Sequence, residues 1–152
     1  MDIFNDDFRD FIQCLNKHNV EYILVGGYAV ILRGYSRSTG DMDIWVNKTE
    51  ANFFKLKSSI IEFGLPVAAI PKDQFFSDEF DVFSFGKPPY AIEVLTALKG
   101  ISTFKEAFAL ATLEAVDNIN VRVIHLKHLI AAKKAAGRSK DINDIENLPN
   151  QN

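Results

Sequence analysis

The stretch that decides the fold is LVGGYAVILRGYSRSTGDMDIWV, residues 24–46. It begins inside a short apolar run, residues 22–25, whose strand-forming residues predict a buried strand. Gly26-Gly27 interrupts that run, and residues 28–33 can form a short helix that ends at Gly34. A polar loop then leads into a second apolar strand over residues 42–46. A strand, a glycine turn, a helix and another strand in so few residues predict a sheet with helical connections.

Two aspartates lie at the start of the second strand. Asp41 and Asp43 are two residues apart, so on a strand their side chains share one face, while Met42, Ile44 and Val46 face the core. Two carboxylates so close together repel each other unless a cation lies between them. Mg²⁺ suits that position because it takes one or two carboxylates together with substrate phosphates. The alternative is a pair of solvated aspartates, since the Asp-x-Asp pattern is short and common.

Glu93 is the third candidate acid. It interrupts the apolar run Tyr90-Ala91-Ile92-Glu93-Val94-Leu95, where an unpaired carboxylate is costly to bury. If this strand pairs with residues 42–46, Glu93 completes a cluster of three carboxylates. A third acid can act as a general base or as a metal ligand. The alternative is an exposed sheet face on which Glu93 pairs with a lysine.

Glycines and cations near these acids suggest a phosphate site. The backbone at Gly26-Gly27 can approach a ligand closely because glycine has no Cβ atom, and Arg37 can bind phosphate through two nitrogens. The alternatives are a tight turn without a ligand and a solvated loop arginine, which could pair with Asp41 or Asp43 when no metal is bound. The basic residues of the C-terminal region read by default as a solvated helix face. They are Lys133, Lys134, Arg138 and Lys140.

The remaining pattern predicts one α/β (α+β) domain over residues 1–148, with a mixed sheet flanked by helices, and a flexible tail over residues 149–152. Helices are expected over residues 4–15, 49–63, 104–110, 126–136 and 141–148. Strands are expected over residues 80–85 and 90–95, joined as a hairpin, and over residues 121–124 at a sheet edge.

Composition limits the class of protein. The chain is 47% hydrophobic and 24% charged, which is typical of a globular domain. Its net charge of -3 predicts no general attraction to nucleic acids or anionic membranes. One cysteine, Cys14, excludes a disulfide framework and a cysteine-based zinc site. We find no secretory signal and no apolar stretch long enough to span a bilayer, so we expect a cytoplasmic protein without a membrane partner.

The chain resembles the nucleotidyltransferase superfamily in segments that follow one another in order. The similarity is strongest to the small bacterial branch that includes the AbiEii-type toxin nucleotidyltransferases, and it extends from about residue 20 to residue 148. The matching segments are Leu24-Val25-Gly26-Gly27-Tyr28-Ala29-Val30, Gly34-x-x-Arg37-x-Thr39-x-Asp41-x-Asp43, Ile92-Glu93-Val94-Leu95, Leu129-Ile130-Ala131-Ala132-Lys133 and Gly137-Arg138-x-Lys140-Asp141. Many active members carry Gly-Ser where this chain has Gly26-Gly27.

The resemblance implies a minimal nucleotidyltransferase fold and a set of roles. Mg²⁺, or Mn²⁺ in its place, would be held by Asp41, Asp43 and Glu93, which are also the implied catalytic residues. An acceptor would attack the α-phosphate of an NTP, and pyrophosphate would leave. The acceptor could be RNA, protein or a small molecule, and an antitoxin protein could be a partner. The implied nucleotide-binding residues are Gly26, Gly27, Arg37, Thr39 and Lys133.

Two other functions compete with this one. The same fold can serve as a catalytically inactive module that binds a nucleotide or a partner. A Rossmann-like dinucleotide site is disfavoured, because the third glycine of its fingerprint is missing and Asp-x-Asp is present. Retention of all three acids favours the enzyme.

Overall fold

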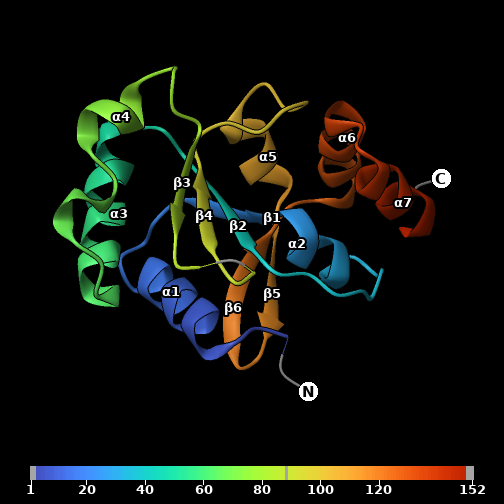
Figure 1. The fold of residues 1–152 in the computed structure, drawn as a ribbon, viewed down its shortest axis with the longest axis horizontal. Helices are drawn as coiled ribbons and strands as arrows, with labels where there is room; N and C mark the ends of the chain where they lie inside the picture. Colours follow the sequence, from blue (N-terminus) through green and yellow to red (C-terminus); the bar gives the residue numbers. More distant parts are fainter. Residues whose placement is uncertain (1–2, 88, 150–152) are drawn as a thin grey trace.

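The computed structural model describes residues 3–87 and 89–149. Six strands form one mixed sheet with the order β3-β4-β2-β1-β6-β5 (Figure 1). β1 is antiparallel to β2 and parallel to β6, whereas β2 is parallel to β4. Antiparallel partners complete the two edges of the sheet. The strands are β1 (Tyr22–Val25), β2 (Met42–Val46), β3 (Val82–Phe85), β4 (Ile92–Leu95), β5 (Thr112–Val116) and β6 (Ile119–Val123).

Helices flank this sheet, so the predicted α/β class is confirmed. Figure 1 shows α3 and α4 on the left and α6 and α7 on the right of the sheet. The helices of the described residues are α1 (Asp6–Lys17), α2 (Gly26–Leu32), α3 (Glu50–Phe63), α4 (Lys72–Phe76), α5 (Phe104–Leu110), α6 (Leu126–Ala136) and α7 (Ser139–Asn147), with a short 3₁₀ helix at Val67–Ala69. None of these helices is long and apolar enough to cross a membrane.

The helices α1 and α3 form where their sequence patterns and capping residues predict them, whereas α4 was not predicted. The apolar side of α1 is buried, and the Asn5 side chain accepts a hydrogen bond from Phe8 N at the helix start. Thr49 caps α3 in the same way, and Gly64 ends it in a left-handed conformation. An edge-to-face contact between Phe11 and Phe63 packs these two helices together.

Residue alternation along β2 directs Asp43 away from the main core. Met42, Ile44 and Val46 are fully buried on one side of the strand. Trp45 points to the other side, where its ring packs edge-to-face on Phe104 of α5 at 5.1 Å between centroids. Asp43 lies on the same side as Trp45, two residues nearer the start of the strand. On the sheet face that carries the acids, α5 therefore covers β2 at Trp45. The start of β2, where Asp43 lies, is not covered by this contact.

One strand prediction is wrong. Residues 121–124 were expected at a sheet edge, but β6 lies between β1 and β5. The edge strand β5 was not predicted because most of its side chains are exposed and its apolar alternation is weak. Asp117 and Asn118, both with positive φ, form the two-residue turn that joins β5 to β6.

The last two described residues pack back on the fold. Leu148 is buried, and Pro149 lies beside Gly34. Apart from Pro149, the tail expected over residues 149–152 lies outside the described residues.

Candidate active site

The three predicted acids come together at the start of two neighbouring parallel strands. Asp43 of β2 and Glu93 of β4 lie directly opposite each other in the register. Asp41 precedes β2, and its Oδ1 accepts a hydrogen bond from Ala91 N at 3.1 Å. A Cβ atom on Gly40 would lie 2.2 Å from Pro89 O, so the two loops also approach closely at this point. The parallel pairing of β2 and β4 is what turns two distant sequence motifs into one cluster.

Gly26 lies against the Asp43 side chain at the turn from β1 into α2. Its φ is +69°, and a Cβ atom there would lie 2.2 Å from Asp43 Oδ2. Only glycine satisfies both the left-handed conformation and this contact. Gly26 was predicted to let a ligand approach the backbone, and its missing Cβ atom also makes room for the Asp43 carboxylate.

We expect Gly26→Ala to destabilise the protein by about 2–3 kcal/mol, because backbone strain adds to a collision that displaces Asp43. Gly137→Ala is the matched control. Gly137 has a φ of +65°, and its nearest neighbour to a Cβ atom is 3.7 Å away. The control should cost about 1 kcal/mol, from backbone strain alone. Urea unfolding of both variants measures the difference, and equal losses would show that Asp43 does not need the space beside Gly26.

Asp43 lies in an electrostatically unfavourable place for a lone carboxylate. Burial, together with a hydrogen bond to Glu93 and the negative charges of Glu93 and Asp41, raises the pKa of Asp43 to about 7. Its Oδ1 is buried and has no hydrogen-bond partner within the described part of the chain. A buried carboxylate oxygen without a donor, beside two further acids, has the environment of a cation ligand.

These residues fit a magnesium ion. Among residues 3–87 and 89–149, no group of three or more His, Cys, Asp or Glu side chains is placed so that it could hold a metal ion. Mg²⁺ commonly binds one or two carboxylates and completes its octahedron with water and substrate phosphates. Asp41 and Asp43 offer such an incomplete set. Glu93 as a further ligand stays a prediction.

Thr39 fills the space beside the second glycine of the turn. A Cβ atom on Gly27 would lie 2.2 Å from Thr39 Oγ1 and 3.4 Å from an Arg37 nitrogen. The Thr39 hydroxyl therefore occupies the place where a serine side chain at residue 27 would begin. The loop before β2 brings a hydroxyl to the glycine turn even though the turn itself has none.

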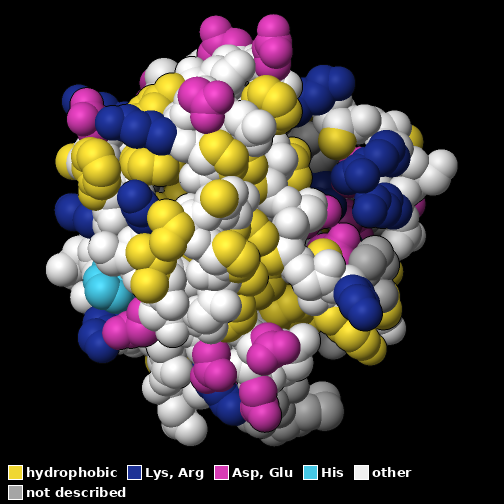
Figure 2. Space-filling model, turned by 60° about the vertical axis from the view of Figure 1, so that its left-hand side comes forward, with side chains coloured by type: hydrophobic (Ala, Val, Ile, Leu, Met, Phe, Trp, Pro, Cys, Tyr) yellow, Lys and Arg dark blue, Asp and Glu magenta, His cyan; other side chains and the backbone are white. Residues whose placement is uncertain are grey.

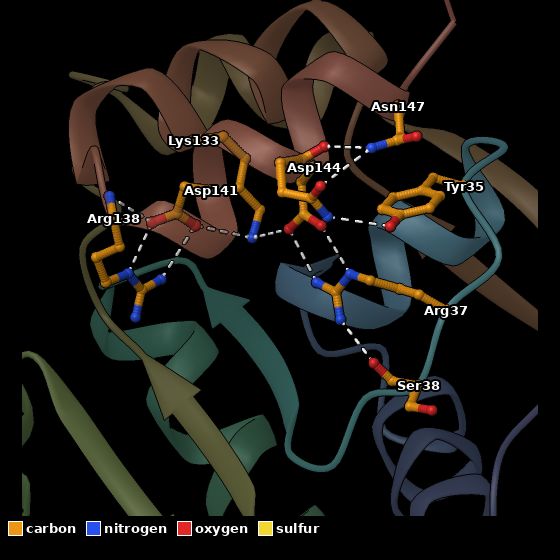
Figure 3. A network of polar contacts seen from close by, with 9 residues as sticks. Tyr35, Arg37, Ser38, Lys133, Arg138, Asp141, Asp144 and Asn147 are labelled. Atoms are coloured by element: carbon orange, nitrogen blue, oxygen red, sulfur yellow. Dashed lines mark hydrogen bonds and ion pairs between the residues drawn. The ribbon is translucent and has the colours of Figure 1, made fainter.

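Two buried aspartates of α7 hold the cations of the site in a network that we call the aspartate clasp, made of Asp141 and Asp144 (Figure 3). Lys133 Nζ lies 3.1 Å from Asp141 Oδ1 and 3.0 Å from Asp144 Oδ2. Arg37 donates two hydrogen bonds to Asp144, at 2.7 and 2.9 Å. Arg138 donates to Asp141 at 2.7 and 3.2 Å.

The clasp corrects two sequence interpretations. Lys133 is not on a solvated helix face, since its side chain is only 8% exposed. Arg37 pairs with neither Asp41 nor Asp43 but with Asp144, and its third nitrogen donates to Ser38 O. Each nitrogen of the Arg37 guanidinium therefore donates a hydrogen bond. These bonds fix the loop that carries Thr39, and the guanidinium itself lies beside Gly27.

The clasp carboxylates are ionised because of their cations. Burial alone would raise the pKa of Asp141, but hydrogen bonds from Arg138 and Lys133 outweigh it and lower that pKa to about 2. Burial likewise opposes ionisation of Asp144, while hydrogen bonds from Arg37 and Lys133 hold its pKa below the usual value. Because both pKa values are lowered on folding, the clasp stabilises the protein above the ordinary aspartate pKa and loses that contribution in acid.

All eight residues predicted for the site line one cavity of about 490 Å³. They are Gly26, Gly27, Arg37, Thr39, Asp41, Asp43, Glu93 and Lys133. Arg138 and Lys140 also line it, so its wall carries both cations and acids. On the right of Figure 2, Lys and Arg side chains surround a hollow in which acidic side chains are visible, the same combination of charges.

Sequence reasoning missed the clasp as a pair. Asp141 and Asp144 are fully buried, although charge alone gave no sign of it. The available signal was their spacing of three residues, which places both on one face of a helix, opposite the basic run of the preceding helix.

The sequence of this chain matches a known protein family. The family described as "nucleotidyltransferase of unknown function (DUF6036)" matches residues 7–149. The chain belongs to this family. Among curated proteins, none matches it in sequence. Membership confirms the resemblance to nucleotidyltransferases, whereas the particular similarity to AbiEii-type toxins is not confirmed.

Solved structures share the nucleotidyltransferase fold. TM1012 of Thermotoga maritima, assigned as a nucleotidyltransferase, has 13% identity and a TM-score of 0.62, with 91% of this chain and 88% of that chain covered. The lincosamide antibiotic adenylyltransferase LnuA, bound to lincomycin, has 13% identity and a TM-score of 0.61, with 97% of both chains covered. An antigenic nucleotidyltransferase-like protein of Paracoccidioides brasiliensis has 14% identity and a TM-score of 0.54, with 93% of this chain and 72% of that chain covered.

Proposed function

We propose that the protein transfers a nucleoside monophosphate from an NTP to a hydroxyl-bearing acceptor, and that the reaction depends on Mg²⁺. The observation that carries the proposal is that Asp41, Asp43 and Glu93 line one cavity together with the cations Lys133, Arg138 and Lys140. Incorporation of label from an α-phosphate-labelled NTP into an acceptor pool tests it. Label in the acceptor supports the proposal, and its absence favours the inactive binding module.

The wall of the cavity suits a triphosphate. Lys133, Arg138 and Lys140 line it beside the open backbone of Gly26-Gly27. Arg138 and Lys140 are exposed to solvent, so an entering phosphate reaches them without breaking the buried part of the clasp. Cations fixed in advance stabilise phosphate charge without a reorganisation cost at the moment of reaction.

The acids have distinct roles in this proposal. Asp41 and Asp43 hold the metal ion, which when bound neutralises phosphate charge and polarises the α-phosphate. Glu93 faces the same cavity and receives the proton of the acceptor hydroxyl. Asp43 must be ionised to bind a cation, so metal affinity should fall as the pH decreases through about 7.

The inactive nucleotide- or partner-binding module is the second candidate. The Arg37 guanidinium and the Lys133 ammonium are already engaged by Asp144, and this observation favours it. The toxin–antitoxin role and its antitoxin partner rest on the sequence resemblance alone, and a neighbouring antitoxin gene would support them.

We infer that Thr39 supplies the hydroxyl that binds phosphate at the glycine turn. Thr39→Ala should weaken Mg-NTP binding by roughly tenfold, the scale of one hydrogen bond to a charged group. In that background Gly27→Ser should recover most of the loss, because the space beside residue 27 is then partly vacated.

Calorimetric titration of each NTP with Mg²⁺ measures both effects. Gly27→Ser alone is the control and should bind poorly, since its Cβ atom meets the Thr39 hydroxyl. If the double variant binds no better than Thr39→Ala, the hydroxyl does not act on phosphate.

A further inference from the structure

A second cavity, of about 240 Å³, adjoins the site on the side of α6. Five residues line both cavities, so the two meet at the acids; they are Gly26, Asp43, Glu93, Lys133 and Arg138. The rest of its wall is mostly apolar and comes from the sheet, the segment after β4 and α6. The apolar residues used below are Leu95, Leu98, Leu129, Ala132 and Ala136.

The turn after β4, which contributes Leu98 to the wall of this apolar cavity, packs closely on α6. Gly100 has a φ of +91°, and a Cβ atom there would lie 2.8 Å from both Ala131 O and Ala135 Cβ of α6. Leu98 and Ile101 bridge to each other in the same turn. The turn therefore rests directly on the helix backbone, and the cavity wall that includes Leu98 is set by the fold before any ligand binds.

The two cavities differ in the chemistry that they can hold. Gly27 and Lys140 line the site cavity and not the apolar one, and an open backbone beside a lysine suits the triphosphate. In phosphoryl transfer the attacking and leaving oxygens lie roughly in line on opposite sides of the phosphorus. If pyrophosphate leaves into the site cavity, the attacking hydroxyl has to approach from the other side of the phosphorus, and the adjoining apolar cavity offers that approach.

We propose that the apolar cavity binds the acceptor, a small molecule with a compact apolar body and a hydroxyl group directed at Glu93. The proposal rests on the nucleotidyl transfer proposed above. A cavity of about 150 Å³ can hold benzene, so this one accommodates a body of one or two rings. Its small volume suits a small molecule better than a polymer end.

In the proposed nucleotidyl transfer, each bond, the leaving group and the proton can be accounted for. The acceptor oxygen forms a bond to the α-phosphorus, and the bond from that phosphorus to the oxygen bridging to the β-phosphate breaks. Pyrophosphate leaves with the electron pair of that bond. The hydroxyl proton passes to the Glu93 carboxylate, and the product is a phosphodiester of the nucleoside and the acceptor.

Ala132→Phe tests the cavity without touching the acids, because Ala132 lines the apolar cavity and not the site cavity. Lys134→Phe places the same ring on an exposed position of α6 and is the control. The probes are 2-phenylethanol and glycerol, followed by NMR titration of the full chain. We expect wild type to bind 2-phenylethanol at least about tenfold more tightly than glycerol, through burial of the ring.

Ala132→Phe should lose this binding while it keeps Mg-NTP binding, which also shows that it folds, and Lys134→Phe should keep both. Equal affinity for the two probes, or unchanged 2-phenylethanol binding in Ala132→Phe, would overturn the proposal. Displacement of 2-phenylethanol by an α,β-methylene NTP with Mg²⁺ would overturn it too, because the cavity would then hold the base. Probe binding without any NTP binding would instead refute the proposed nucleotidyl transfer.

Discussion

Asp43→Asn is expected to abolish Mg²⁺-dependent NTP binding and nucleotidyl transfer, and at the same time to stabilise the metal-free protein at pH 8. The triphosphate and the acid cluster are both anionic, so they bind each other only with a cation between them. Asparagine keeps the shape of Asp43 beside Gly26 but loses the charge that holds the cation. Calorimetry with each NTP, with and without Mg²⁺, measures the first effect.

The stability gain follows from the pKa of Asp43. Folding raises this pKa from 3.8 to about 7. The protonated form is favoured in the folded state, so the group's stabilising contribution is complete below pH 3.8 and is lost as the pH rises through about 7. Asparagine does not titrate, so the Asp43→Asn variant does not lose stability in this way as the pH rises. The advantage of Asp43→Asn should therefore grow between these two pH values and stay constant above them.

Urea unfolding of metal-free wild type and Asp43→Asn at several pH values measures this advantage. A gain in stability together with lost binding separates the removal of a metal ligand from misfolding. Equal NTP binding by both proteins in Mg²⁺ would refute the metal bridge.

Glu93→Gln should lower transfer by roughly 10²-fold or more while most NTP binding remains, because a positioned general base acts in the transition state. Glutamine keeps the size of the side chain opposite Asp43 and removes its charge. It also removes one of the causes that raise the Asp43 pKa, so metal binding should persist to lower pH than in wild type.

Asp41→Asn is the comparison for this variant and should damage both binding and transfer. Single-turnover transfer and calorimetry on both variants separate the two roles. Unchanged transfer by Glu93→Gln would remove Glu93 from the mechanism.

Local patterns predicted much of this fold. Gly64 and Gly137 were expected to end helices and do so in left-handed conformations. Residues 82–85 and 92–95 form the expected hairpin. β5 escaped prediction because an edge strand buries few side chains and leaves little periodicity. Position in a sheet depends on which strands pair, and no single segment contains that information.

Residue patterns predicted the acids of the candidate site, whereas Lys133 was singled out by the family resemblance alone. Asp41, Asp43 and Glu93 could be grouped because carboxylates at strand positions are unusual enough to need a reason. Lys133 could not be distinguished from Lys134 by charge, although one is buried in the clasp and the other is exposed. Whether a charge is buried depends on a partner, and the partners of Lys133 lie on a different helix.

The central claim is that this chain moves the α-phosphate of an NTP onto an acceptor. The most direct measurement incubates wild type and Asp43→Asn with Mg²⁺, an extract as acceptor pool, and each NTP labelled at either the α- or the γ-phosphate. We predict that wild type places α-label on an acceptor and releases γ-label as pyrophosphate, and that Asp43→Asn does neither. Metal-dependent binding without α-label transfer from any NTP would contradict the account and identify the chain as a binding module.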